Sequence, residues 1–297
     1  MTSLLAFVRL TRPLFLFGGF AGVALGAAVA AWSGHRLDGV TYLWVQALAT
    51  AFQLMVHYAN DYFDRAGDAL AQRTAWSGGS GVLPSGALHP RVALIAASIC
   101  AALGLAVTVR FWLGGNATVG WIGLAIFVLA WSYSAPPLRL AARGLGELDT
   151  VLVVAVLVPA AGYAAFAGRL DARLENAVVA PVAAMLAMML CVELPDAGAD
   201  LAAGKRTLVL RWGPALTWRM VAIATAVAGA SAVIAELKLH AGIGALALLP
   251  AAGATVALLW LSLRDPRPAS MAFWGVALYA TITGGLAAAY GVAAAGR

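Results

Sequence analysis

Long apolar stretches recur along nearly the whole chain, and they constrain its fold more than any other feature of the sequence. A helix needs about 20 mainly apolar residues to cross the hydrocarbon core of a bilayer. Nine stretches meet this requirement, at roughly residues 13–32, 40–60, 91–113, 117–134, 147–168, 176–195, 214–235, 241–263 and 269–293. The longest connection, residues 61–90, is polar and rich in glycine, which is typical of a functional loop. The sequence therefore predicts an all-α integral membrane protein with nine transmembrane helices in a single domain over residues 1–297.

The composition excludes the main alternatives to a membrane protein. Of the 297 residues, 63% are hydrophobic and only 11% are charged, and the mean hydropathy is +0.88. A soluble domain carries about 25% charged residues, so this chain has too little polar surface to cover a water-soluble globule. Cys100 and Cys191 lie inside apolar stretches without Cys or His neighbours at ligand spacing, which argues against a disulfide framework or a zinc site.

The basic residues are distributed unevenly between the two sides of the predicted bundle. With the N-terminus inside, 13 of the 19 Lys and Arg residues lie in cytoplasmic segments and 6 lie on the opposite side. Cytoplasmic segments of membrane proteins carry such an excess. We therefore expect a multi-pass protein of the cell membrane with a cytoplasmic N-terminus and its C-terminus on the opposite side. The net charge of +6 then needs no nucleic-acid partner.

The first apolar stretch contains three glycines at four-residue spacing, Gly18, Gly22 and Gly26. Small residues at this spacing let two transmembrane helices approach closely. Although Arg9 and Arg12 precede the stretch as they would in a signal peptide, its apolar run exceeds the usual core of about 7–15 residues. We expect a retained helix that packs closely against a neighbour.

An acidic cluster follows the second apolar stretch, in the run NDYFDRAGD at residues 60–68. Acidic residues are informative here because a charge at the centre of a bilayer costs on the order of 3 kcal/mol. Asn60, Asp64 and Asp68 are four residues apart, so on a helix they share one face.

A second acidic cluster follows the sixth stretch, in the run ELPDAGAD at residues 193–200. Asp196 and Asp200 are again four residues apart, and Glu193 lies three residues before Asp196. Three predicted helices separate the two clusters, so both leave the membrane on the same side, which the basic residues identify as cytoplasmic. The two clusters are therefore expected to converge at one cytoplasmic mouth.

Several carboxylates gathered near hydrocarbon repel one another and need a cation. Carboxylate oxygens suit Mg²⁺, which takes one or two carboxylates together with substrate phosphate oxygens and water. Two clusters favour two or more Mg²⁺ ions that bridge to a diphosphate, whose remaining charge Lys and Arg side chains are able to meet. Those available on the same side are Lys205, Arg206, Arg139 and Arg143. The alternative interpretation is that the carboxylates are solvated helix ends and interfacial ion pairs.

The motifs resemble those of the UbiA superfamily of intramembrane prenyltransferases. Residues 60–68 are similar to the first Asp-rich motif of that superfamily, and the pattern from Asp196 through Asp200 to the run GKRTL at 204–208 is similar to its second. Three further runs fit the resemblance, namely TRP at 11–13, LPSG at 83–86 and YSAPPL at 133–138. The resemblance covers nearly the whole chain.

The resemblance implies nine helices around a central cavity whose cytoplasmic mouth binds a prenyl diphosphate through Mg²⁺. Ionisation would release diphosphate and leave an allylic cation, which an electron-rich acceptor attacks. Neutralising the diphosphate and excluding water from the cation are physical requirements of that chemistry. Carried over by motif, the metal ligands are Asn60, Asp64, Asp68, Asp196 and Asp200. The diphosphate contacts are Asn60, Arg139, Lys205 and Arg206, and the catalytic residues are Asp64, Asp196, Lys205 and Tyr133.

Four residues near these motifs have two interpretations each. The ring of Tyr133 stabilises the cation or anchors a helix end at the interface. Asp61 lies on a different helix face from Asp64, where it orients a ligand or pairs with a basic residue. Glu193 is a buried base or acceptor orienter, or the partner of an Arg. His57 faces the acceptor or packs in the core.

The sequence leaves the identity of the acceptor substrate undetermined. The run RGLGE at 143–147 and the run SGGSG at 77–81 resemble segments of 1,4-dihydroxy-2-naphthoate prenyltransferases, which favours a phenolic or naphthoate acceptor in quinone biosynthesis. Leu194-Pro195 and the SAPP run at 134–137 depart from that branch. A terpene cyclase of the same superfamily, which needs no acceptor, is the main alternative. A transporter is disfavoured because both clusters lie at helix ends on one face.

Overall fold

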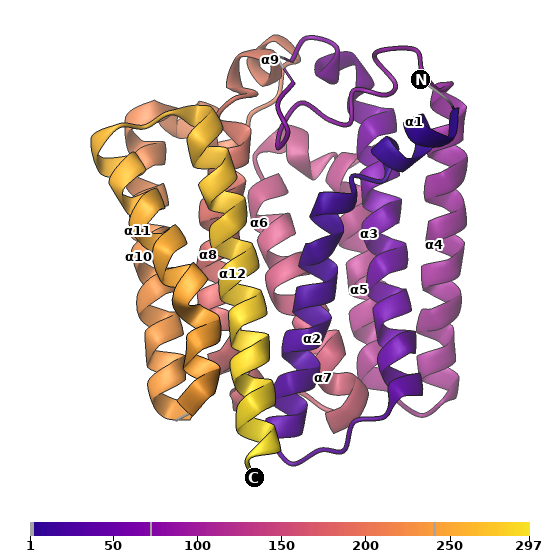
Figure 1. The fold of residues 1–297 in the computed structure, drawn as a ribbon. Coiled ribbons are helices and arrows are strands. Elements are labelled where there is room, and N and C mark those ends of the chain that lie inside the picture. Colours follow the sequence, from indigo (N-terminus) through magenta and orange to yellow (C-terminus); the bar gives the residue numbers. More distant parts are fainter. Residues whose placement is uncertain (1–2, 72, 240–241) are drawn as a thin grey trace.

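The computed structural model describes residues 3–71, 73–239 and 242–297, and this part of the chain is helical without a β-strand. Its helices form one bundle, with the N-terminus at one end and the C-terminus at the other (Figure 1). The α-helices are α1 (Ser3–Leu10), α2 (Phe17–Trp32), α3 (Gly39–Asp68), α4 (Pro90–Leu113), α5 (Ala117–Ser134), α6 (Gly146–Leu152), α7 (Val158–Ala167), α8 (Ala172–Glu193), α9 (Ala197–Ala202), α10 (Leu208–Leu239), α11 (Leu249–Arg264) and α12 (Pro268–Ala295).

Nine helical segments within the described residues are long and apolar enough to cross a membrane, which confirms the predicted number. The second of them, α3, continues as one helix through Asp68, so it carries the whole first acidic cluster. Asp38 begins it, because its side chain accepts a hydrogen bond from the Thr41 amide at 2.8 Å and so satisfies a free N–H of the first turn.

Four of the nine segments are interrupted or change helix type, which the periodicity of the sequence did not predict. In the first, a turn at Thr11-Arg12 and a 3-10 turn over Pro13–Leu16 separate α1 from α2. In the fifth, a π-helical turn over Val153–Leu157 joins α6 to α7. In the seventh, Gly213 breaks α10 with a positive φ of 70° just before Pro214. The eighth begins as a 3-10 helix over Gly242–Leu248 that precedes α11. Such irregular turns are frequent at functional sites.

The glycines of α2 let this helix approach α7 closely, as their spacing predicts. A Cβ at Gly26 would overlap the carbonyl oxygen of Pro159, and one at Gly22 would lie 2.9 Å from a side-chain carbon of Val158. The same helix also packs against α12. In this way α2 joins the helices around α3 to those around α8, as Figure 1 shows.

The connection between α3 and α4 lies at the N-terminal end of the bundle, beside α9 (Figure 1). Both acidic clusters lie at this end, because α3 and α8 both run toward it. The predicted convergence of the two clusters is therefore reproduced by the path of the chain.

Candidate active site

A cavity of about 510 Å³ lies inside the bundle at the end where the two acidic clusters meet. Its walls come from α2, α3, α5, α6, α8 and α12, together with the connection after α3. One part is lined by charged and polar groups, and another by apolar and thioether side chains such as Val153, Met185 and Val276. The cavity therefore combines a polar mouth with an apolar interior.

Seven of the nine predicted site residues line this cavity. They are Asn60, Asp64, Asp68, Tyr133, Asp196, Asp200 and Lys205. Asp64 is 7% exposed, and it accepts a hydrogen bond of 2.9 Å from the amide of Asn60. The same amide donates to the Ser134 hydroxyl at 3.0 Å, while its oxygen accepts from Arg12 at 3.1 Å. In this arrangement Asn60 fixes the orientation of Asp64, and its role as a metal ligand stays a prediction.

Lys205 connects the two acidic clusters. Its Nζ atom lies 3.3 Å from Asp64 Oδ2 and 3.0 Å from Asp200 Oδ1. Burial by itself would lower the pKa of Lys205, but the carboxylates of Asp64 and Asp200 outweigh it and raise that pKa above its ordinary value. Lys205 is therefore a permanent cation at the mouth of the cavity.

The glycine-rich run after α3 contacts the second cluster. The Gly78 amide donates to Asp196 Oδ2 at 2.7 Å. Burial raises the pKa of Asp196 above its ordinary value, although the hydrogen bond from Gly78 opposes this. A Cβ at Gly79 would overlap the carboxyl of Asp68, and the φ of Gly79 is +64°. Glycine is required there on both grounds.

The donor set fits a divalent cation that arrives with phosphate oxygens. Asp68 Oδ2 and Asp196 Oδ1 are buried oxygens without a hydrogen-bond partner. In the part of the chain that the structure describes, no three His, Cys, Asp or Glu side chains form a ready-made metal cage. Mg²⁺ needs no such cage, because phosphate oxygens and water complete its shell.

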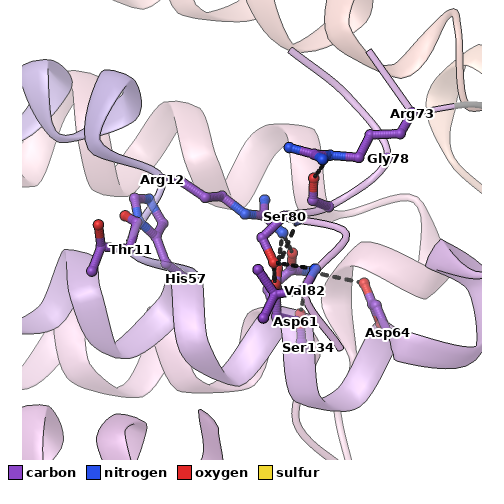
Figure 2. Close-up of polar contacts among 12 residues, drawn as sticks. Thr11, Arg12, His57, Asp61, Asp64, Arg73, Gly78, Ser80, Val82 and Ser134 are labelled. Atoms are coloured by element: carbon purple, nitrogen blue, oxygen red, sulfur yellow. Dashed lines mark hydrogen bonds and ion pairs between the residues drawn. The ribbon is translucent and has the colours of Figure 1, made fainter. Parts of the chain in front are cut away.

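Asp61 forms a buried network with Arg12 and Ser80 that holds three segments together (Figure 2). Its side chain is 1% exposed, and it accepts hydrogen bonds from the Arg12 guanidinium and the Ser80 hydroxyl. Of its two interpretations, pairing with a basic residue is therefore the one the structure contains. His57 lies beside this network, where its Nδ1 atom is 2.9 Å from the Thr11 carbonyl oxygen, and its ring lines the cavity.

Arg139 and Arg206, both predicted to bind diphosphate, do not line the cavity and are exposed. Backbone hydrogen bonds fix the segments that carry these two residues outside the cavity. The Arg206 amide donates to the Ala142 carbonyl at 3.0 Å, and the Glu147 carboxylate accepts a hydrogen bond from the Leu208 amide. Together these bonds tie the start of α10 to the turn before α6 and to the first turn of α6 itself. Their diphosphate role stays a prediction without support from this geometry.

Sequence reasoning missed Arg12 and Asp149 as cavity residues. The signal for Arg12 was its place in the TRP run, while Asp149 belongs to no quoted motif. Glu193 lines the cavity, and its Oε2 atom has no hydrogen-bond partner, so it does not have the Arg partner that was one of its interpretations.

Solved structures with the same fold include several UbiA homologues. One from Aeropyrum pernix K1 matches with a TM-score of 0.68 and 18% identity, covering 90% of this chain and 96% of that one. One from Archaeoglobus fulgidus bound to GPP and Mg²⁺ matches with a TM-score of 0.62 and 15% identity, covering 95% and 99%. A digeranylgeranylglyceryl phosphate synthase matches with a TM-score of 0.62 and 16% identity, covering 96% and 99%.

No curated protein sequence matches this chain significantly. The sequence profile of the UbiA prenyltransferase family, in contrast, matches residues 20–282, which include both acidic clusters and all nine membrane-spanning segments in whole or in part. Together with the helical fold of the described residues and the cavity between the clusters, this match establishes that the chain belongs to the UbiA prenyltransferase family.

Proposed function

We propose that this protein transfers a prenyl group from an isoprenoid diphosphate to an aromatic acceptor, phenolic or naphthoate, as a step of quinone biosynthesis. One observation carries the proposal: both acidic clusters and Lys205 line the polar mouth of a cavity whose interior is apolar. The mouth suits a diphosphate with its cations, and the interior suits a hydrocarbon tail.

Asp64, Asp68, Asp196 and Asp200 would hold Mg²⁺, as the unpartnered oxygens of Asp68 and Asp196 suggest. When bound, Mg²⁺ neutralises the charge of the diphosphate as it departs. Asn60 keeps Asp64 oriented through its amide. The A. fulgidus homologue has been solved with GPP and Mg²⁺, which supports the same pairing here.

Lys205 would turn from the two carboxylates toward the diphosphate oxygens. As the C–O bond of the prenyl diphosphate breaks, its electron pair leaves with the diphosphate, and the Lys205 ammonium stabilises that developing charge. The apolar interior excludes water from the allylic cation, and the ring of Tyr133 faces the cavity where it is able to stabilise the cation. A ring carbon of the acceptor then forms the new C–C bond, and its proton passes to the released diphosphate.

The orientation in the membrane is part of the proposal. The acidic mouth and the N-terminus lie at the same end of the bundle. The excess of Lys and Arg on that side supports a cytoplasmic mouth and an N-terminus inside the cell. Soluble isoprenoid diphosphates would then reach the mouth from the cytoplasm.

Product analysis by mass spectrometry tests the proposal. Purified protein with Mg²⁺ receives geranyl, farnesyl or geranylgeranyl diphosphate, with and without a panel of phenolic and naphthoate acceptors. We expect a product that carries both tail and ring and that forms only when an acceptor is present. A hydrocarbon or terpene alcohol formed without any acceptor would instead identify a cyclase.

A further inference from the structure

Asp149 is a buried carboxyl group that the diphosphate chemistry does not use. It lies in the first turn of α6, is 7% exposed and lines the cavity. Its Oδ1 atom is shielded from solvent and has no hydrogen-bond partner. A buried polar oxygen without a partner is costly, so a substrate group that donates a hydrogen bond is expected to satisfy it.

Glu193, the last residue of α8, presents a second such oxygen to the same cavity. Its Oε2 atom is also buried and unpartnered. Glu147 lies against the Glu193 side chain and is fully buried. Tyr133 lines the same cavity as Asp149 and Glu193, and these two carboxyl groups are called its acidic wall.

No Lys or Arg side chain is paired with this acidic wall in the described ranges, because no ion pair there involves Asp149 or Glu193. The two Lys and Arg side chains that line the cavity pair with other carboxylates, Lys205 with Asp64 and Asp200, and Arg12 with Asp61. Only the Nε atom of Arg12 is left without a hydrogen-bond partner. The wall therefore offers hydrogen-bond acceptors that no cation pairs with.

We infer that Asp149 and Glu193 bind the acceptor and select a neutral aromatic diol over an aromatic carboxylate. The inference rests on the proposed function and narrows its acceptor class. Two ring hydroxyls match the unpartnered carboxyl oxygens as donors. A carboxylate on the ring would face like charges, or else would enter a low-dielectric site without a counter-charge.

Two acceptors that differ only in a carboxylate test the inference. The full-length enzyme in nanodiscs, with Mg²⁺ and the prenyl diphosphate it uses best, receives 1,4-dihydroxynaphthalene or 1,4-dihydroxy-2-naphthoate. We expect kcat/KM for the diol to exceed that for the carboxylate by about tenfold or more. Equal values, or a preference for the carboxylate, would overturn the inference.

Variants of the two wall residues, Asp149 and Glu193, test whether they cause the preference for the diol over the carboxylate. In Asp149→Asn the KM for the diol should rise about tenfold, the loss expected for one hydrogen bond to a charged group, while the KM for the prenyl diphosphate changes little. Asp149→Arg should shift the preference toward the carboxylate. Asp265→Asn, in the exposed turn before α12, is the matched control. Glu193→Gln provides a second test of the same wall, and each variant is checked for folding by size-exclusion chromatography.

The outcomes separate the two proposals. If Asp149→Asn and Glu193→Gln fold and leave the KM for the diol unchanged, the inference is wrong although the protein remains a prenyltransferase. Diphosphate release without transfer to either ring likewise overturns it. If none of the prenyl diphosphates is turned over, the proposed function fails, and the inference fails with it.

Discussion

Single contacts between residues distant in the sequence hold the site together. Arg12 reaches Asp61, Lys205 reaches Asp64, and the Gly78 amide reaches Asp196. Each contact joins a loop or a helix start to one of the two acidic clusters. Changes at such residues should therefore affect the reaction more than the fold.

Lys205→Met should slow diphosphate release by about 100- to 1,000-fold, the usual effect of removing one group that stabilises developing negative charge. The measurement is the rate of diphosphate release at saturating substrate. Lys238→Met, at the exposed far end of α10, is the matched control and should retain the rate. Equal rates in both variants would remove Lys205 from the mechanism.

Gly79→Ala should lower the rate of prenyl transfer by about 100-fold, because its Cβ would push aside the carboxyl of Asp68 and small misplacements at a reacting site are costly. Gly86 has a similar φ of +70° but no atom near its added Cβ. Gly86→Ala therefore introduces the same backbone strain without touching Asp68. A rate as low in Gly86→Ala would mean that strain, and not Asp68, is responsible.

The residues of the two clusters were predictable from the sequence, because four-residue spacing on a helix determines a common face. Partners such as Arg12 and Ser80 were not, since no local pattern indicates which loop residue meets Asp61. Arg139 and Arg206 were chosen as nearby positive charges, but proximity in the sequence does not determine on which side of a turn a side chain lies.

Among the helices, the positions of the membrane spans followed from apolar length, and their interruptions did not. The break at Gly213-Pro214 has a local signal, and the predicted seventh stretch indeed begins at residue 214. The π turn at Val153–Leu157 lies in a uniformly apolar run. Pro159 follows this turn at the start of α7 and lacks the N–H that a continuing α-helix would need, so proline marks this interruption as well.

The contact between α2 and α7 gives a prediction at this scale. Gly26→Ala should lower the free energy of unfolding by about 1–3 kcal/mol, because the added methyl group meets the backbone of Pro159. Thermal unfolding in detergent provides the measurement. Gly253→Ala in α11, where the added Cβ meets open space, is the control. If the two variants unfold at the same temperature, α2 and α7 pack less closely than described.

For the molecule as a whole, the orientation in the membrane is testable by cysteine labelling. In a background with Cys100 and Cys191 replaced by serine, Leu37→Cys lies in the connection between α2 and α3, and Ala75→Cys lies at the acidic end. A membrane-impermeant maleimide should label Leu37→Cys in intact cells and Ala75→Cys only after permeabilisation. The reverse pattern would invert the topology.

Removing divalent cations should abolish turnover and leave the fold intact. The bundle is held by apolar packing, and Lys205 pairs with both Asp64 and Asp200. Chelation with EDTA should therefore stop product formation without changing the helical circular dichroism signal, and added Mg²⁺ should restore activity. Turnover that persists in EDTA would contradict a metal-dependent mechanism.

The position of Lys205 between two carboxylates also governs the order in which ligands arrive. A divalent ion that comes alone competes with an ammonium group already seated between Asp64 and Asp200. An ion that comes with a diphosphate brings an anion to which this ammonium is free to turn. If the proposed function is correct, we expect the affinities for metal and isoprenoid diphosphate to be coupled, each ligand strengthening the binding of the other by linkage. Loading would then be cooperative, and departure of the diphosphate would loosen the metal in turn.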